Sequence, residues 1–349
     1  MVIAGVASAL PKHQYDQRIL LNGLKQFWGP KLENPEFMQR LHQRVGVDTR
    51  HLALPMEQYA GITTWGAANN HWIDVALDLS EQALRLALDR AAVPQDRLGA
   101  IFFVSVTGIA SPSIDARLIN RMTLPVNVKR LPIFGLGCVA GAAAVARAAD
   151  YVRAFPDQVA AVIAVELCSL TLQHDDLSIA NLISSGLFGD GAGVALVAGA
   201  AVGCRGPRIL ATRSVLYPDT EQVMGWDISE RGFRIVLSRE VPIVIEQFFA
   251  ADVDAFLGTE GLSRADISAW ILHTGGPRVL EATAEALALP EGALDASWAC
   301  LRRTGNLSSA SVLLVLEEFL LNRPQPAGSY SLMAAMGPGF CSELLLLQW

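Results

Sequence analysis

The chain has 349 residues, of which 52% are hydrophobic and 17% charged, and its formal net charge is −7. This composition excludes a disordered protein, and the negative charge disfavours non-specific binding to nucleic acid. The length predicts two domains or one unit used twice. No apolar stretch is long enough for a good membrane span, and the N-terminus is not a convincing signal peptide. Five cysteines without a CxxC pair argue against a disulfide framework and a cysteine-rich zinc site, so we expect a cytoplasmic protein without a metal.

The first half of the chain alternates between predicted strands and helices. An N-terminal strand ends at Pro11, and the more polar residues 22–73 predict helices and loops added to this half. An amphipathic helix at 79–92 then leads to a buried strand at 100–108. The glycine-containing run 188–199 predicts a hairpin turn between apolar strands.

The second half repeats this order. A helix at 242–257 leads to a strand at 268–276, and its Thr274-Gly275 ending lies 167 residues after Thr107-Gly108. Gly305-Asn306 opens a helix 168 residues after Gly137-Cys138 opens one. Such internal similarity indicates one α/β unit used twice.

The boundary between the two units is expected in a segment rich in Gly, Pro and Arg that follows residue 202. We therefore predict an N-terminal half at 1–205 and a C-terminal half at 206–349.

Cys138 is the candidate nucleophile. It follows a strand-like run that ends in Gly-Leu-Gly, and an apolar helix of small residues begins directly after it. A cysteine in the first turn of a helix meets unpaired N–H groups and the positive end of the helix dipole, which favour the thiolate. The alternative is a buried structural cysteine, which is the usual role of cysteine in such an apolar segment.

His273 and Asn306 are the candidate partners of Cys138. His273 ends a buried strand before Gly-Gly-Pro, where an imidazole can act as a base or hydrogen-bond to an enolate oxygen. Asn306 occupies the position in the second half that Cys138 occupies in the first. If the halves pack about a pseudo-dyad, the three side chains share one pocket suited to acyl transfer through a thioester. A satisfied core histidine and an asparagine helix cap are the structural alternatives.

The sequence resembles the type III polyketide synthases, the chalcone synthase-like branch of the thiolase superfamily. The resemblance covers nearly the whole chain and rests on six motifs: GLGCVAGAAA at 135–144, VELCSLTLQ at 165–173, GLFGDGAG at 186–193, WILHTGGPRVLE at 270–281, TGNLSSAS at 304–311 and MGPGF at 336–340. It implies a duplicated thiolase fold with five layers, αβαβα, and a homodimer with one complete site per subunit.

By this resemblance, Cys138 matches the acyl-accepting nucleophile, His273 the catalytic histidine and Asn306 the catalytic asparagine. The implied reaction loads a starter acyl-CoA onto the cysteine and decarboxylates malonyl-CoA to an enolate. Repeated Claisen condensations and a cyclisation then follow. The substrates are CoA thioesters, and no metal or redox cofactor is implied.

The resemblance also implies the surroundings of the site. Ser308, Gly337 and Pro338 are expected in the substrate pocket. Leu172 and Ile235 stand where the family often carries two phenylalanines, and these smaller aliphatic side chains imply a roomier, more aliphatic cavity. We therefore expect a fatty acyl-CoA starter and an alkylpyrone or alkylresorcinol product, as in similar bacterial synthases.

Three arginines are expected to bind CoA by the same resemblance: Arg40, Arg44 and Arg278. Arg50 belongs to the same basic cluster as Arg40 and Arg44, for which a solvated face is the structural alternative to phosphate binding.

Two other functions remain open from the sequence. A ketoacyl synthase of the fatty-acid initiation type also uses Cys, His and Asn, although that group usually reads HQAN where this chain reads HTGG at 273–276. An inactive thiolase-fold partner is the second alternative, and the retention of all three site residues argues against it.

Overall fold

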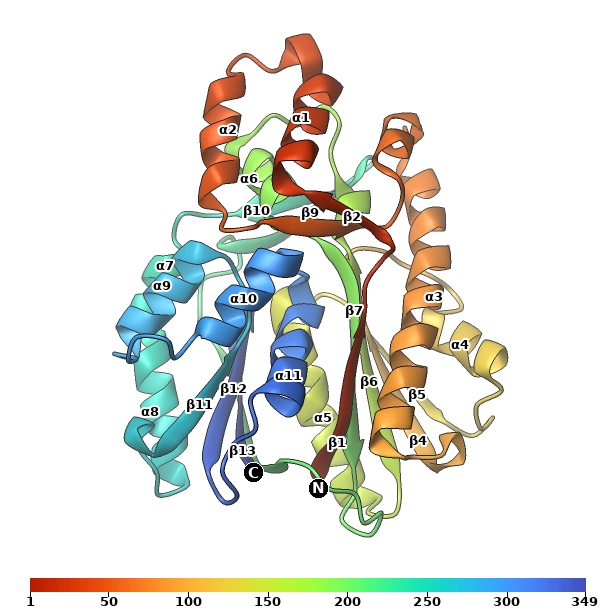
Figure 1. Ribbon diagram of the computed structural model, residues 1–349, viewed down its shortest axis with the longest axis vertical. Helices are drawn as coiled ribbons and strands as arrows, with labels where there is room; N and C mark the ends of the chain where they lie inside the picture. The colour runs from red at the N-terminus through yellow and green to blue at the C-terminus, as the bar shows by residue number, and fades with distance from the viewer.

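A nine-stranded sheet runs through the molecule in the order β11-β12-β13-β8-β1-β7-β6-β4-β5 (Figure 1). The computed structural model describes residues 1–349. The strands of the first half are β1 (Val2–Ala9), β4 (Leu98–Val104), β5 (Lys129–Ile133), β6 (Val159–Leu167) and β7 (Asp190–Ala198). Those of the second half are β8 (Arg208–Leu216), β11 (Ile267–Leu272), β12 (Tyr330–Gly337) and β13 (Cys341–Gln348).

The two half-sheets share one topology. In the first, β4 lies parallel to β6, β6 antiparallel to β7, and β7 antiparallel to β1. In the second, β11 lies parallel to β12, β12 antiparallel to β13, and β13 antiparallel to β8. The halves join where β1 pairs with β8 through Val2 and Arg208. This repetition confirms the predicted duplicated α/β fold.

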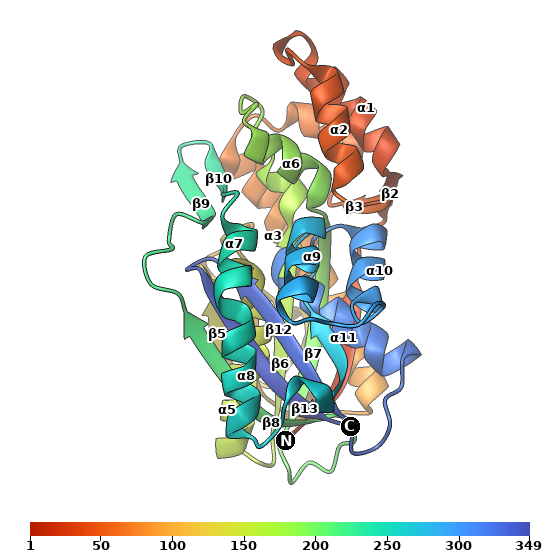
Figure 2. The same ribbon diagram turned by 90° about the vertical axis from the view of Figure 1, so that its left-hand side faces the viewer.

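Helices fill the space between the half-sheets and cover their outer faces, which gives the five layers (Figures 1 and 2). The central pair is α5 (Ala140–Ala154) and α11 (Ser311–Asn322). On the outer face of the first half-sheet lie α3 (Trp65–Ala91) and α4 (Ile114–Met122). On that of the second lie α8 (Ala250–Thr259) and α9 (Pro277–Ala286).

The central layer is apolar because it faces sheet on both sides. Side chains of α5 and α11 belong to one buried cluster with residues of both half-sheets, including Val162 and Met333. All nine residues of β6 and all nine of β7 are buried. Continuous apolar runs of this kind are expected for strands covered on both faces.

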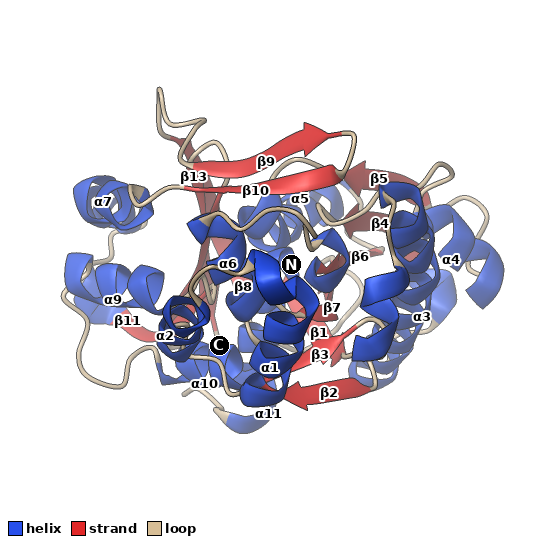
Figure 3. Ribbon diagram, turned by 90° about the horizontal axis from the view of Figure 1, so that it is seen from above, coloured by secondary structure: helices blue, strands red, loops and turns tan.

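Added segments cover the end of the sheet at which the first two helices lie (Figure 3). Residues 22–73 form helices and loops as predicted, except that Thr49–Leu52 form a strand that pairs with His13–Asp16. The covering elements are β2 (His13–Asp16), α1 (Gln17–Trp28), α2 (Pro35–Arg44), β3 (Thr49–Leu52), α6 (Ile179–Leu187), β9 (Met224–Ser229) and β10 (Gly232–Leu237). The remaining helices are α7 (Val241–Val244), which continues into a π-helical turn, and α10 (Asp295–Thr304).

The predicted hairpin turn at 188–199 is wrong. These residues lead from α6 directly into β7, and Gly191 and Gly193 lie within the strand. A Cβ atom on Gly189 would lie 2.2 Å from the carbonyl oxygen of Thr304, and one on Gly193 would lie 2.9 Å from Cβ of Leu313. The glycines therefore serve close packing against the second half.

Hydropathy along the helices sets one further limit on the fold. None of the helices combines the length and the apolar character that a membrane crossing requires.

Candidate active site

Cys138 lies in a tight turn between β5 and α5. The turn is a short 3-10 segment, Gly137–Val139, and Cys138 is 7% exposed. Gly137 adopts φ +56°, and a Cβ atom there would lie 2.6 Å from Cδ of Pro338. Glycine is therefore required both by the backbone conformation and by the close approach of the second half. The predicted order of strand, glycine turn and helix is confirmed.

A matching turn from the second half faces Cys138. It comprises Ser308–Ala310 and leads into α11. The Cys138 thiol donates a hydrogen bond to Oγ of Ser308 over 3.5 Å. A Cβ atom on Gly141 of α5 would lie 2.1 Å from the carbonyl oxygen of Ser309. The starts of α5 and α11 thus meet, as the internal repeat predicts.

Cys138, His273 and Asn306 line one small buried cavity, which we call the inner cavity, of about 30 Å³. His273 follows β11, and its backbone N–H donates to Ala334. Neither ring nitrogen of His273 has a hydrogen-bond partner. Burial lowers the pKa of His273 to about 3, so the imidazole is neutral at pH 7 and both ring nitrogens are free to hydrogen-bond to a substrate.

Backbone contacts fix the side-chain amide of Asn306. Its Oδ1 accepts a hydrogen bond from the backbone N–H of Ser308 over 2.7 Å. The backbone of Asn306 donates to Leu187 and accepts from Gly189, which joins it to the start of β7. Because Oδ1 is engaged, the Nδ2 amide is the group left to donate to an oxyanion in the inner cavity.

Burial raises the pKa of the Cys138 thiol to about 12, and the hydrogen bond with Ser308 acts in the opposite direction. The sequence predicted that the helix start would favour the thiolate, but the loss of solvent outweighs that effect. A neutral thiol beside a neutral imidazole is the resting pair.

The chain matches the family models of the chalcone and stilbene synthases. The N-terminal domain model covers residues 3–201 and the C-terminal domain model residues 209–349. The chain belongs to the type III polyketide synthases.

Relatives and solved structures agree with this family. The chain is 48% identical to a 1,3,6,8-tetrahydroxynaphthalene synthase of Streptomyces peucetius subsp. caesius, over 99% of this chain and 93% of that protein. It is 35% identical to a putative chalcone synthase of Bacillus subtilis, over 99% and 98% of the two chains. The crystal structure of the Streptomyces coelicolor 1,3,6,8-tetrahydroxynaphthalene synthase superposes with a TM-score of 0.95 at 32% identity, covering 100% of this chain and 99% of that one.

A second space in this type III polyketide synthase, the main cavity, has a volume of about 150 Å³ and also borders Cys138. Four of the five predicted pocket residues line it, among them Leu172, Ile235 and Ser308. Pro338 lines it as well, whereas Gly337 lines neither cavity and packs against the backbone of the Cys138 turn. A Cβ atom on Gly337 would lie 2.7 Å from the backbone nitrogen of Val139.

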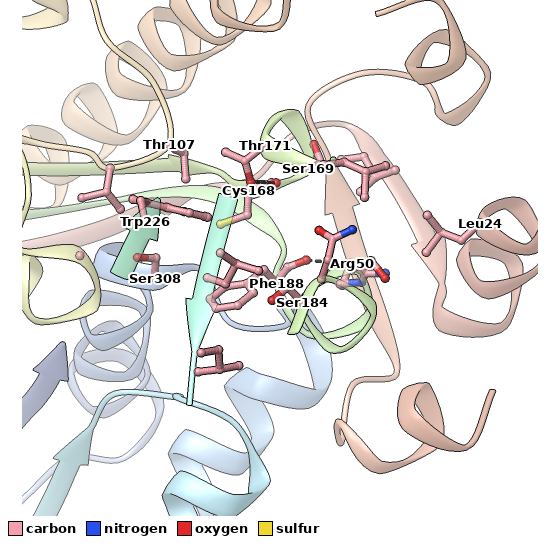
Figure 4. A pocket seen from close by; sticks show the side chains of 18 of the residues that line it. Leu24, Arg50, Thr107, Cys168, Ser169, Thr171, Ser184, Phe188, Trp226 and Ser308 are labelled. Atoms are coloured by element: carbon pink, nitrogen blue, oxygen red, sulfur yellow. Dashed lines mark hydrogen bonds between the residues drawn. The ribbon is translucent and has the colours of Figure 1, made fainter. Parts of the chain in front are cut away.

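Phe188 lines both cavities, and the sequence analysis did not single it out. In Figure 4 its ring lies between Ser308 on one side and Arg50 on the other. An isolated β-bridge between Phe188 and Asn306 holds this ring beside the inner cavity. The aromatic side chain that borders both cavities thus belongs to the FGDG sequence at 188–191. Leu172 and Ile235 lie in the wall of the main cavity.

The three arginines predicted to bind CoA line neither cavity. Arg40 and Arg44 are exposed on α2, and Arg278 is exposed on α9 with Glu281 at 3.5 Å. A Cβ atom on Gly46 would lie 3.1 Å from Cγ of Pro277, so the chain after α2 contacts the start of α9. Arg44 and Arg278 flank this contact.

Arg50 and Cys168 also line the main cavity (Figure 4). The alternative of a solvated face is wrong for Arg50, which is 4% exposed. Alternation along β3 was the available signal, because Arg50 and Leu52 point to the buried side. All five cysteines are free, and the structure contains no group of three or more His, Cys, Asp or Glu placed to hold a metal ion.

Proposed function

We propose that Cys138 is the acyl acceptor of this malonyl-CoA-condensing acyltransferase, with His273 and Asn306 as its proton partner and oxyanion donor. The observation that carries this assignment is the inner cavity, which all three side chains line. In the loading step, Sγ of Cys138 attacks the starter thioester while its proton moves to the free imidazole of His273. That proton then leaves with the CoA thiol.

Extension requires a carbanion equivalent. Loss of carbon dioxide from malonyl-CoA places the electron pair on the enolate of the thioester. The Asn306 amide and the N–H of the His273 ring donate hydrogen bonds to the enolate oxygen. The enolate carbon then attacks the acyl group on Cys138, and the cysteine thiolate leaves. A further round begins when the extended chain returns to the sulfur.

We propose that malonyl-CoA also provides the starter and that the product is a polyhydroxylated aromatic compound. The names of the Streptomyces relatives support this choice. The wall of the main cavity supports it too, because it carries polar side chains suited to the oxygens of a poly-β-keto chain. These include Arg50, Tyr59, Ser169, Asn181 and Ser184.

A fatty acyl starter with an alkylpyrone or alkylresorcinol product is the second candidate. One observation favours it: Leu20, Leu24, Phe27 and Met56 line the part of the main cavity formed by the N-terminal segments. Apolar side chains of this kind stabilise an alkyl chain in proportion to the buried area.

Product analysis by mass spectrometry distinguishes these candidates. The enzyme is incubated with malonyl-CoA alone, and then with malonyl-CoA and acyl-CoA starters of increasing length, without carrier protein. An aromatic product from malonyl-CoA alone is the expected result, and Cys138→Ala should abolish it. Alkylated pyrones or resorcinols formed only with long starters would establish the second candidate. Activity that requires a carrier-protein substrate would indicate a single-condensation ketoacyl synthase instead.

The exposed arginines are proposed to hold the CoA moiety. Arg40 and Arg44 on α2, together with Arg278 on α9, present cations for its phosphates. Arg40→Ala and Arg44→Ala should raise KM for malonyl-CoA with little change in kcat, because phosphate contacts contribute equally to substrate and transition state.

We propose that two copies of the chain pair through β5. This strand ends the sheet, and apolar side chains in and around it are exposed, including Leu131 and Phe134. Exposed apolar side chains at the end of a sheet favour association with a second copy of the chain. Sedimentation should show a dimer for the wild type and a monomer for Leu131→Glu; a monomeric wild type would contradict the proposal.

A further inference from the structure

A buried cation without a carboxylate partner lies in the wall of the main cavity. Arg50 forms no ion pair within 4.0 Å and is 4% exposed. Burial lowers its pKa to about 10, so the guanidinium stays charged at pH 7. A buried charge without a counter-ion is costly, and a bound anion would relieve that cost.

The nearby carboxylate of Asp190 does not neutralise Arg50 by contact. Its oxygens accept hydrogen bonds from the backbone of Ala53 and from both the backbone and the hydroxyl of Ser169. Asp190 therefore acts on Arg50 only through space. The contact positions of the guanidinium remain available to another acceptor.

Two contacts fix the orientation of Arg50. Its Nε donates to Oε1 of Gln17 over 3.1 Å, and Nη1 donates to the carbonyl oxygen of Phe188 over 2.7 Å. Gln17 is itself anchored, because its Nε2 donates to the carbonyl oxygen of Gly186 over 2.8 Å. The Arg50 guanidinium is thus held in one orientation, while its Nη2 makes no hydrogen bond.

A second unpaired group is connected to Arg50 through Phe188, whose carbonyl accepts from Arg50 and whose N–H donates to the carbonyl oxygen of Ser184. Oγ of Ser184 on α6 is buried and has no hydrogen-bond partner. Ser184 and Arg50 both line the main cavity and lie on the same side of Phe188 in Figure 4. A guanidinium with a neighbouring hydroxyl is a suitable donor set for a carboxylate.

We propose that Arg50 and Ser184 form a carboxylate-binding subsite that holds the free end of a malonyl-primed chain. This inference rests on the proposed function, in which malonyl-CoA provides the starter. Each condensation inserts a two-carbon unit between the Cys138 sulfur and the older part of the chain. The starter carboxylate therefore moves away from the sulfur in every round and reaches the cavity wall. Binding it there selects a dicarboxylate-derived chain over an alkyl one.

Arg50 also supports the fold near Asn306, and the test must separate this role. Its stem packs on Gly305, where a Cβ atom would lie 3.1 Å from Cδ of the arginine. Phe188, whose carbonyl it binds, forms the bridge to Asn306. A variant that only disturbs this packing would slow every starter alike, whereas loss of a carboxylate subsite affects malonyl-primed chains selectively.

The experiment compares two starters in wild type, Arg50→Gln, Arg50→Lys and Ser184→Ala. Products from malonyl-CoA alone and from hexanoyl-CoA with malonyl-CoA are measured by mass spectrometry. Arg50→Gln should lower the full-length malonyl-primed product about tenfold or more and release shorter chains, since a charge-assisted hydrogen bond is lost. The hexanoyl-primed product should change less than about threefold, because this chain has no terminal carboxylate for Arg50 to bind. Arg50→Lys should restore part of the malonyl-primed product, and Ser184→Ala should give a smaller loss in the same direction.

Arg90→Gln is the control. Arg90 also donates to a backbone carbonyl, that of Val6, but it pairs with Glu317 and lines neither cavity. This variant should leave the product ratio unchanged.

A binding measurement adds a readout that does not need turnover. Glutarate should raise the Tm of Cys138→Ala but not of the double variant with Arg50→Gln. Equal losses with both starters, or glutarate stabilisation that persists without Arg50, would overturn the subsite. A wild type that makes no product from malonyl-CoA alone would overturn the proposed starter instead, and the glutarate result would still decide the subsite.

Discussion

Burial moves Cys138 and His273 in opposite directions along the pH scale, toward neutral thiol and neutral imidazole. At pH 7 the resting site therefore holds neither the thiolate of Cys138 nor the imidazolium of His273. Transfer of the thiol proton to the imidazole creates a thiolate and an imidazolium in the same cavity, where their attraction is strong because water is scarce. Under the proposed function, the reactivity of the sulfur depends on the histidine rather than on the helix start alone.

Replacing His273 with Gln should make Cys138 harder to ionise. His273 is the proposed acceptor of the thiol proton, so without the imidazole alkylation by iodoacetamide should slow at pH 7 by about tenfold or more. The midpoint of its pH profile should move upward. Peptide mass mapping measures the rate, with the half-buried Cys204 as an internal reference. An unchanged midpoint would show that His273 does not accept the proton.

The side chains of the site were predictable where a motif marks them. Cys138, His273 and Asn306 each follow a recognisable strand or glycine turn. Arg50 was not recognised, because its burial depends on the partners that α6 and Gln17 supply. Phe188 was missed for a similar reason, since its position between two cavities follows from the bridge to Asn306.

At the scale of elements, close contact between α5 and the turn before α11 sets the geometry of the site. The contact depends on Gly141, whose hydrogen faces the backbone of Ser309. Because the residues along α5 are small, the second half packs closely against it, and Oγ of Ser308 lies within hydrogen-bond distance of the Cys138 sulfur. The helix starts are thereby held in register by backbone rather than by flexible side chains.

Gly141→Ala should separate these elements. The added Cβ would have to move backbone atoms, which should cost about 1–3 kcal/mol in the free energy of unfolding. It should also lower kcat, since Ser308 and Asn306 belong to the displaced segment. Urea unfolding and steady-state kinetics measure the two effects.

Gly66→Ala provides the control for that substitution. Gly66 also lies in a helix, but nothing lies within 4 Å of the position of its Cβ. Stability should remain unchanged or rise by less than about 1 kcal/mol. Equal effects of the two substitutions would contradict the close-contact account.

At the scale of the whole molecule, a buried carboxylate joins the two halves. Glu166 of β6 accepts hydrogen bonds from Val106 over 3.2 Å and from Thr107 over 2.9 Å, both in the first half. It also accepts one from the hydroxyl of Ser309 in the second half. Burial raises its pKa to about 7, and these hydrogen bonds act in the opposite direction.

The raised pKa of Glu166 makes stability depend on pH. The folded state holds the proton more tightly than the unfolded state, so its contribution is complete below about pH 4.5 and is lost as pH rises toward 7. The loss is about 3 kcal/mol for a shift of this size. Glu166→Gln keeps the shape without the titration, because the Ser309 hydroxyl can turn to accept from the amide.

Urea unfolding between pH 5 and pH 8 tests this expectation. The variant should gain stability relative to the wild type as pH rises, by up to about 3 kcal/mol. The comparison is made at each pH because Asp190, whose pKa burial also raises, titrates in both proteins. A difference that stays constant with pH would exclude Glu166 as the titrating group.

The sequence by itself determined the α/β class and the duplication, and it predicted three site residues that line one cavity. It could do so because hydrophobic periodicity and glycine turns are local and recur at a constant offset. The tertiary structure alone decided which atoms touch where the halves meet, which ring borders both cavities, and that 188–193 enters a strand instead of a hairpin. It also decided the protonation of Cys138, since local sequence marks the helix start while the amount of excluded water depends on residues from both halves.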